Sequence, residues 1–292
     1  AAVVSGLIYP IFGAWAWGSL FDGEGWLKAM GFIDFAGSTV VHSIGGWVAL
    51  AGIIVLGPRL GRFGRNGQVH YLAGHNLPLV ALGGFVLWLA WFGFNAASTV
   101  RADVSIGRIA LNTHLAACAS AVAYMVYTLI RGKAILMRGT INASLGGLVA
   151  ITAGCATMSP VYAIISGAVA GVLVSILPVV MEKLRLDDVV DAVTVHGFCG
   201  AWGTLAAGLF FENNMCKAGI IAVQGLGILT AFAWGFGVAL IVFKVLDLVL
   251  GGLRVSKQHE QRGLDYTEHA ELSYPEFQRD VTFETDDMTK RH

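Results

Sequence analysis

Charged residues are scarce in this sequence. Lysine, arginine, aspartate and glutamate make up 13% of the 292 residues, whereas 56% are hydrophobic, and the formal net charge is zero. Soluble domains carry about 25% charged residues, so the composition excludes an ordinary soluble globular protein. A balanced net charge also offers no electrostatic basis for binding a polyanion, and we expect no nucleic-acid partner.

Cysteine is also rare, and its four positions are widely spaced: Cys118, Cys155, Cys199 and Cys216. They lie in or beside apolar segments and lack the close spacing of a zinc or redox motif. We interpret them as small packing residues. The sequence therefore predicts no metal site and no cofactor.

Long apolar runs, by contrast, are abundant. A membrane-spanning helix needs about 20 mostly apolar residues, and several windows here approach that length almost without charge. Because strands of a membrane barrel would show ten-residue alternation instead, the predicted fold class is all-α, a polytopic membrane helical bundle. The eight predicted spans are 1–20, 36–56, 76–98, 108–130, 141–157, 160–180, 192–211 and 219–250.

The basic residues gather in alternate connectors between these spans. By the positive-inside rule, such connectors are expected on the cytoplasmic side, and an even number of spans then places both chain ends there. The residues concerned are Arg59, Arg62, Arg65, Arg131, Lys133, Arg138, Lys183 and Arg185.

The composition changes abruptly near Gly251. Beyond it comes the mixed-charge segment GLRVSKQHEQRGLDYTEHAELSYPEFQRDVTFETDDMTKRH. We therefore predict two domains, a transmembrane domain over residues 1–252 and a cytoplasmic C-terminal tail over residues 253–292. The end of the tail is poor in apolar residues, and we expect it to be disordered without a partner.

Two histidines within apolar spans follow an aspartate at the same interval. Asp34 precedes His42 by eight residues, and Asp188 precedes His196 by eight. The match indicates an internal duplication of the kind found in transporters. Ionisable groups at membrane depth usually line a pathway, although each histidine could instead hydrogen-bond a neighbouring helix. For the aspartates, helix capping is the favoured interpretation.

The segment LWLAWFGFNAAS adds aromatic and hydroxyl groups to another span. Phe94 and Ser98 lie one helical turn apart and share a face, with Trp91 nearby. In the first span, Trp15 and Trp17 are typical of interfacial anchors, but an aromatic face can also hold a small cation. A path lined by rings and a hydroxyl is thus one interpretation.

These segments together resemble one family. DFAGSTVVH, WFGFNAAS, NTHLAA, GLVAIT and VHGFCGAWGT are similar, in this order, to motifs of the ammonium transporter (Amt/Mep/Rh) family, with matches into the tail near Asp265. The resemblance implies an inverted-repeat fold and a homotrimer in which each subunit encloses its own narrow pore. It also implies a multi-pass protein of the plasma (inner) membrane that carries ammonium or ammonia and is not an enzyme.

The resemblance assigns roles along the pore. His42 and His196 match the family's twin histidines, and Phe94 matches one of its two stacked gate phenylalanines. Trp91 and Thr152 match positions near the pore or gate. In this interpretation ammonium loses its proton, ammonia passes the gate, and the histidines relay the proton.

Three further residues match the family's outer site. Trp17 and Ser98 match the residues that recruit ammonium, and Asp34 matches an aspartate near that site. In the tail, GLRVSKQHEQRGLD resembles the segment through which PII signalling proteins control bacterial members. A PII protein is therefore an expected partner.

The resemblance also has a gap at the start of the chain. The sequence begins, without methionine, where the family's fourth helix would be. We expect the first three family helices, which include the second gate phenylalanine, to be supplied by another segment or chain.

Two other functions remain open at this point. The first is an ammonium sensor on the same fold that signals through the tail. The second is a redox protein in which His42 and His196 are axial ligands of a b-type haem.

Overall fold

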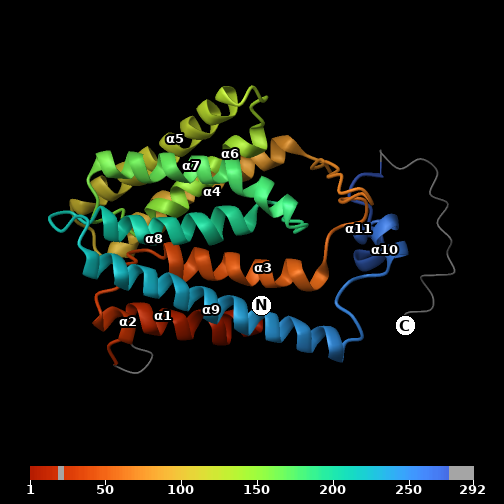
Figure 1. Cartoon of the computed structure of the whole chain (residues 1–292), viewed down its shortest axis with the longest axis horizontal. Coiled ribbons are helices and arrows are strands. Elements are labelled where there is room, and N and C mark those ends of the chain that lie inside the picture. Colours follow the sequence, from red (N-terminus) through yellow and green to blue (C-terminus); the bar gives the residue numbers. More distant parts are fainter. Residues whose placement is uncertain (19–22, 276–292) are drawn as a thin grey trace. The chain divides into compact units, whose positions relative to one another are not determined.

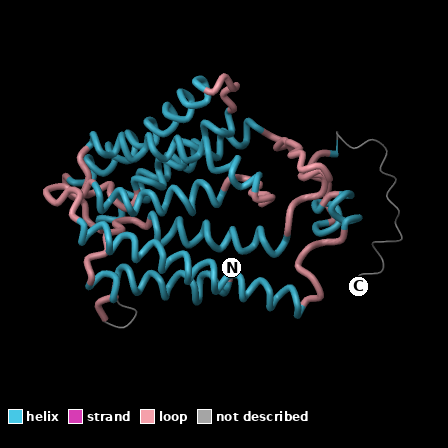
Figure 2. The backbone as a smooth tube through the Cα atoms, in the orientation of Figure 1, coloured by secondary structure: helices cyan, strands magenta, loops and turns pink. Residues whose placement is uncertain are grey.

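A computed structural model gives the structure of the chain and describes residues 1–18 and 23–275. All regular secondary structure in this part of the chain is helical, apart from a single β-bridge between Phe63 and Val69. Figure 2 shows these helices joined by loops. The all-α fold predicted from the apolar runs is confirmed.

The chain divides into two compact units, the first covering Ala1–Leu253 and the second beginning at Arg254. The helices of the first unit are the π-helix η1 (Val4–Ile8), α1 (Tyr9–Trp17), α2 (Trp26–Ala29), the π-helix η2 (Ser38–Ser43), α3 (Ile44–Leu56), α4 (Leu77–Ala96), the 3₁₀-helix η3 (Ala97–Thr99), α5 (Ser105–Ile130), α6 (Met137–Ile151), α7 (Pro160–Lys183), the π-helix η4 (Val193–Phe198), α8 (Cys199–Leu209) and α9 (Ala218–Val249).

Five helices are long and apolar enough to cross a membrane within the described residues: Ser38–Leu56, Leu77–Thr99, Ser105–Ile130, Pro160–Lys183 and Ala218–Val249. The other three predicted spans coincide with shorter helices, which are Val4–Trp17, Met137–Ile151 and Val193–Leu209. The polytopic membrane bundle is thus confirmed, while three of its eight spans are shorter than predicted.

The first unit contains two groups of packed helices. On one side α1, α3 and α9 lie together around a core that includes Phe12, Ile44 and Ala231, as Figure 1 shows. On the other side α4, α5, α6 and α7 pack around a core that includes Leu148 and Val174. The segments η2 and η4 connect the groups, because η2 contacts α6 and α8 while η4 contacts α3, α6 and α7.

Small residues allow α5 and α7 to lie in direct backbone contact. A Cβ atom added at Gly167 would lie 2.2 Å from the Ala116 carbonyl oxygen, and one at Gly171 would lie 2.1 Å from the Ser120 carbonyl oxygen. Lipid gives no hydrophobic drive for helix association, so close backbone packing of this kind supplies much of the stabilisation.

Between Arg254 and residue 275, the described part of the second unit contains two short helices, α10 (Lys257–Arg262) and α11 (Leu264–His269). The Ser256 side chain caps α10 by accepting a hydrogen bond from the His259 N–H. Arg254 forms an ion pair with Glu260, and the Arg262 guanidinium lies over the Tyr266 ring, 4.3 Å from its centroid. These contacts lie in the part of the tail that the structure describes, up to residue 275. The end of the tail, which is predicted to be disordered, lies outside the described residues.

Candidate functional site

Two aspartates, Asp34, which is buried, and Asp188, which is partly buried, cap the two helices that carry the histidines. Asp34 accepts hydrogen bonds from the backbone N–H groups of Gly37, Ser38, Thr39 and Val40, at 2.7 to 3.1 Å. Burial raises the pKa of Asp34 to about 6, and these four N–H groups act in the opposite direction. The carboxylate thus satisfies the donors left free at the start of η2.

The second aspartate repeats this arrangement. Asp188 accepts from the N–H groups of Ala192 at 2.8 Å and Val193 at 2.7 Å, at the start of η4. The capping that was the favoured interpretation for both aspartates is confirmed in both halves of the chain. Each histidine therefore lies eight residues after the aspartate that caps the start of its helix.

Reciprocal glycine contacts bring the two capped helices together. Gly46 and Gly200 each follow a histidine by four residues. A Cβ atom at Gly46 would lie 2.2 Å from the Gly197 nitrogen, and one at Gly200 would lie 2.3 Å from the Ser38 carbonyl oxygen and 2.5 Å from the Ser43 hydroxyl. The two halves thus cross where Gly46 faces Gly197 and where Gly200 faces the Ser38 backbone and the Ser43 hydroxyl.

This crossing places the two imidazoles against each other. The Nδ1 atoms of His42 and His196 lie 3.3 Å apart, and the ring planes are inclined by 20° with centroids 5.3 Å apart. The Nε2 atom of His42 is buried and has no hydrogen-bond partner in the described chain. The pair therefore includes one buried nitrogen whose hydrogen-bonding capacity is unused in the described chain.

Three more predicted residues adjoin this pair. The Trp91 ring stacks on His42 at a centroid distance of 5.0 Å, and the Phe94 ring is tilted against His42 at 5.5 Å. The Trp91 indole donates a hydrogen bond of 3.0 Å to the Thr152 hydroxyl, which itself donates to the Leu148 carbonyl at 2.7 Å. His42, His196, Trp91, Phe94 and Thr152 thus form one connected cluster.

The geometry of the pair bears on the haem interpretation. Two axial histidine nitrogens, each about 2 Å from a metal ion, would lie about 4 Å apart across it. The Nδ1 atoms of His42 and His196 are closer than that, and the two rings stack in contact. No porphyrin ring fits between them, so the haem interpretation is rejected.

The three residues predicted for an outer site are held by separate contacts. The Trp17 indole donates a hydrogen bond of 2.6 Å to the Asp34 carbonyl oxygen. The Ser98 hydroxyl donates to the Phe94 carbonyl at 2.8 Å, as expected for residues one turn apart. Trp17 is thereby tied to the start of η2, and Ser98 to the helix that carries Phe94.

Sequence reasoning missed several polar contacts that hold the helices of this site. The Ser38 hydroxyl donates to the Val149 carbonyl and accepts from the Ala153 N–H, both at 2.7 Å. The hydroxyls of Thr39 and Thr204 lie 2.6 Å apart. The sequence analysis also missed Gly46 and Gly200. The matching spacing, a glycine four residues after each histidine, could have indicated them.

The fold and site define a class: a multi-pass membrane protein with two related halves that pair one histidine each among aromatic rings. Comparison with known proteins gives the particular family. The profile described as Ammonium Transporter Family matches residues 1–274, and the chain belongs to this family.

Relatives agree with this assignment. The chain is 41% identical to the ammonium transporter Amt2 of Archaeoglobus fulgidus over 95% of its own length and 64% of that protein. It is 40% identical to a putative ammonium transporter of Synechocystis sp., over 92% of its own length and 52% of that protein. The chain thus spans about half to two thirds of these relatives.

Solved structures show the same fold. A structure titled "Sensor Amt Protein" matches with a TM-score of 0.87 and 43% identity, covering 91% of this chain and 68% of that one. The crystal structure of Candida albicans Mep2 matches with a TM-score of 0.76 and 26% identity, over 86% of this chain and 58% of that one. The resemblance inferred from the sequence motifs is confirmed.

Proposed function

We propose that this chain contributes the conducting path of a transporter that moves ammonium nitrogen across a membrane. The observation that carries the proposal is the contact between His42 and His196 inside a membrane helical bundle, with Nε2 of His42 buried and unpartnered. Buried polar groups without partners are costly. A small molecule that both donates and accepts hydrogen bonds would offset that cost.

Recruitment is proposed at Trp17 and Ser98, with Asp34 nearby. Ammonium resembles potassium in charge and size but carries four N–H donors, so a selective site needs acceptors. The proton of the Ser98 hydroxyl is engaged by the Phe94 carbonyl, which leaves its lone pairs to accept from ammonium. An indole face held by Asp34 offers a surface that attracts cations.

Conduction past Phe94 requires loss of the proton. Moving an unpaired ammonium ion into an apolar pore costs many kcal/mol of free energy. Loss of the proton, which leaves neutral ammonia, requires less free energy. Neutral ammonia then passes the Phe94 ring, which acts as the gate, and meets the Nε2 atom of His42. Trp91 and Thr152 line this path. The proton travels separately through the paired imidazoles, because an imidazole can accept a proton at one nitrogen and donate one from the other.

The wider assembly is also a proposal. The active protein is a homotrimer in the plasma (inner) membrane, with residues 1–252 as its transport domain. Residues 253–292 form a cytoplasmic regulatory tail to which a PII protein binds. The ordered helices α10 and α11, with their capping and ion-pair contacts, support a recognition role for this tail.

The test is to measure current and ammonium flux in liposomes that contain the protein. An inward ammonium gradient should drive both, and His42→Leu should reduce both by at least about tenfold. His114→Leu is the matched control, because His114 also lies in a spanning helix but contacts Trp88 and Phe92. Unchanged flux in His42→Leu would contradict the proposed path, and electroneutral flux at every pH would contradict the relay.

A second function, ammonium sensing, is favoured by one observation. The matching structure titled "Sensor Amt Protein" shares 43% identity with this chain. The two functions use the same proposed site, so only a measurement of flux across the membrane distinguishes transport from sensing. Uptake of methylammonium by cells that lack their own carriers would support transport, and binding without uptake would support sensing.

A further inference from the structure

The residue three positions after each capping aspartate has a left-handed backbone. In the first half of the chain this residue is Gly37, with a φ angle of 111°, and in the second half it is Asp191, with a φ angle of 59°. In each case its carbonyl accepts a hydrogen bond from the N–H group four residues later, at 3.1 Å from Val41 and at 2.8 Å from Val195. The repeated cap therefore requires this conformation, but only the first half meets it with glycine.

An aspartate at this position costs conformational energy that glycine would avoid. A Cβ atom disfavours the left-handed region, although aspartate tolerates it better than most residues do. Strained residues of this kind persist where the surrounding structure holds them and the side chain has a task. The Asp191 side chain is 16% exposed, and its contacts lie within the protein.

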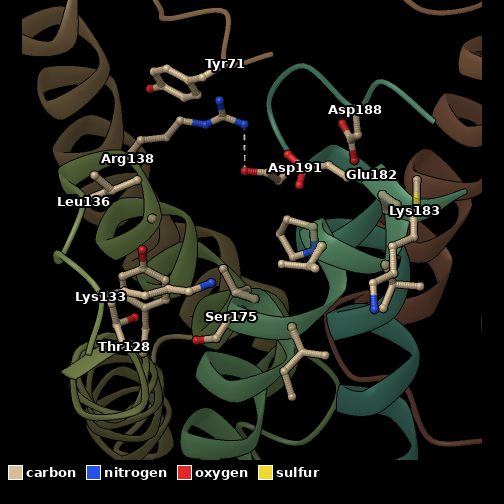
Figure 3. A pocket seen from close by; sticks show the side chains of 18 of the residues that line it. Tyr71, Thr128, Lys133, Leu136, Arg138, Ser175, Glu182, Lys183, Asp188 and Asp191 are labelled. Carbon is tan, nitrogen blue, oxygen red and sulfur yellow. Dashed lines mark hydrogen bonds and ion pairs between the residues drawn. The ribbon is translucent and has the colours of Figure 1, made fainter. Parts of the chain in front are cut away.

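The Asp191 carboxylate joins the segment before η4 to the start of α6. Its Oδ2 atom accepts one hydrogen bond from the Arg138 guanidinium and one from the Asn142 side-chain amide, both at 2.8 Å. Figure 3 shows Arg138 extending to Asp191 beside a cavity of about 440 Å³ that residues of α5, α6 and α7 line. A glycine at position 191 would leave both α6 side chains without this acceptor.

Arg138 also needs a negative partner because of its place in the helix. It is the second residue of α6, and the N-terminal end of a helix carries partial positive charge. A cation there is destabilised unless a carboxylate lies next to it. The ion pair with Asp191, at 2.8 Å, therefore fixes the first turn of α6 against the segment that precedes η4.

The other end of α6 supports the cluster around the histidines. Thr152, the residue that follows α6, accepts a hydrogen bond from the Trp91 indole, and the Trp91 ring stacks on His42. The Val149 carbonyl accepts at 2.7 Å from the Ser38 hydroxyl of η2. The first half of the chain thus holds α6 near its C-terminal end, and the second half holds it near its N-terminal end. Because a packed helix moves as a rigid element, a shift at the N-terminal end would be transmitted to Trp91.

We propose that Asp191 is a positioning residue for transport, which holds α6 through Arg138 and Asn142 and thereby fixes the Trp91 ring beside the histidine pair. This role rests on the transport function proposed above. Asp191 acts through α6 and not on the transported ion itself, so its loss should change the selectivity of the path.

Asp191→Gly is the direct test, because it gives the second half the residue that the first half already has at this position. The left-handed backbone and the Asp188 cap are retained, and only the carboxylate is lost. The ratio of maximal ammonium flux to maximal methylammonium flux in liposomes should fall at least about threefold, since a less tightly held path discriminates less against the additional methyl group. This ratio does not depend on the amount of folded protein, so a loss of stability alone would not change it.

Two further variants complete the comparison. Asparagine tolerates the left-handed backbone and keeps one side-chain carbonyl oxygen, so Asp191→Asn should give a flux ratio between those of wild type and Asp191→Gly. Glu182→Gln is the matched control, because this carboxylate lines the same cavity but belongs to α7 and pairs with Arg62, at 2.7 Å. Its flux ratio should equal that of wild type.

A spectroscopic measurement makes the test independent of transport. The indole N–H resonance of Trp91, identified by its absence in Trp91→Phe, should shift in Asp191→Gly and remain unchanged in Glu182→Gln. If wild type carried no ammonium but this shift occurred, the proposed function would fail, whereas the hold of Asp191 on Trp91 would be supported. An unchanged Trp91 resonance in Asp191→Gly, an unchanged flux ratio in a protein that transports, or equal changes in Glu182→Gln would each overturn the positioning role.

Discussion

The Nδ1 atoms of His42 and His196 lie 3.3 Å apart although 154 residues separate them in the chain. At that distance only one of the two nitrogens can carry the shared hydrogen, so the neutral rings adopt complementary tautomers. One ring then presents a bare Nε2 and the other an Nε2–H group. This arrangement suits ammonia, which accepts one hydrogen bond and donates three.

The glycine crossing should be the most sensitive feature of this pair. Gly46→Ala would place a methyl group 2.2 Å from the Gly197 backbone nitrogen, where no side chain can move aside. We expect a loss of about 1–3 kcal/mol in the free energy of unfolding and separation of the two imidazoles. Thermal unfolding and ammonium flux of the reconstituted protein would measure these effects.

The adjacent residue provides the control. A Cβ atom at Gly45 meets nothing within 4 Å, so Gly45→Ala should leave flux unchanged and stabilise α3 by up to about 1 kcal/mol. If both variants behaved alike, the crossing would not determine the distance between the histidines.

Much of this arrangement could be predicted from the sequence, but for different reasons in each part. The long apolar runs gave the helices because membrane spans need a length of apolar residues that shows directly in the chain. The position of Asp34 and Asp188 near the starts of two predicted spans predicted both caps, because capping is local.

The remaining contacts depend on which helices meet. The bond from Trp91 to Thr152 joins residues 61 positions apart, and the Thr39 to Thr204 contact joins residues 165 apart. No local pattern reports such pairs. The π-helical turns at both histidines were not predicted either. An apolar run has the same composition whether its backbone follows the α-helical or the π-helical hydrogen-bond pattern.

The bond between Trp91 and Thr152 predicts an asymmetric response. Trp91→Phe keeps a ring against His42 and loses one hydrogen bond, at a cost of about 1 kcal/mol. Thr152→Val leaves the buried Trp91 N–H group without an acceptor, at a cost of about 1–3 kcal/mol. The double variant should therefore be less destabilised than the sum of the single variants, and thermal unfolding of all four proteins would measure this coupling. Additive effects would show that the bond contributes nothing.

Asp34 should make stability depend on pH in an unusual direction. Its pKa in the folded protein, about 6, exceeds its ordinary value of 3.8, so the folded state binds the proton more tightly than the unfolded state. Stability then rises as pH falls through 6, by about 1 kcal/mol between pH 7 and pH 5. Comparing the unfolding of wild type and Asp34→Asn isolates this contribution, because all other titrating groups are shared. A difference that stayed constant across this range would disprove the assignment.

Asp187 should show the opposite pH dependence. Burial alone would raise its pKa, but hydrogen bonds from Arg59 at 2.7 and 2.9 Å, together with the nearby charge of Arg62, hold the pKa of Asp187 below its ordinary value. Asp187→Asn would leave both guanidinium groups less well paired at a site where the carboxylate is 2% exposed. We expect a loss of about 1–3 kcal/mol at neutral pH, since Arg59 is partly exposed.

The sign of this second dependence follows from the lowered pKa. The contribution of Asp187 is complete above the unfolded-state value of about 4 and disappears only as pH falls through the lower, folded-state value. The difference in unfolding free energy between wild type and Asp187→Asn should thus be constant from pH 7 to pH 5 and shrink below pH 4. Glu24→Gln, which alters an exposed carboxylate on another loop, should show no difference. The difference in unfolding free energy between wild type and Asp187→Asn should not decrease between pH 7 and pH 5. If it did, the ion pair with Arg59 would not be what keeps Asp187 charged in this range.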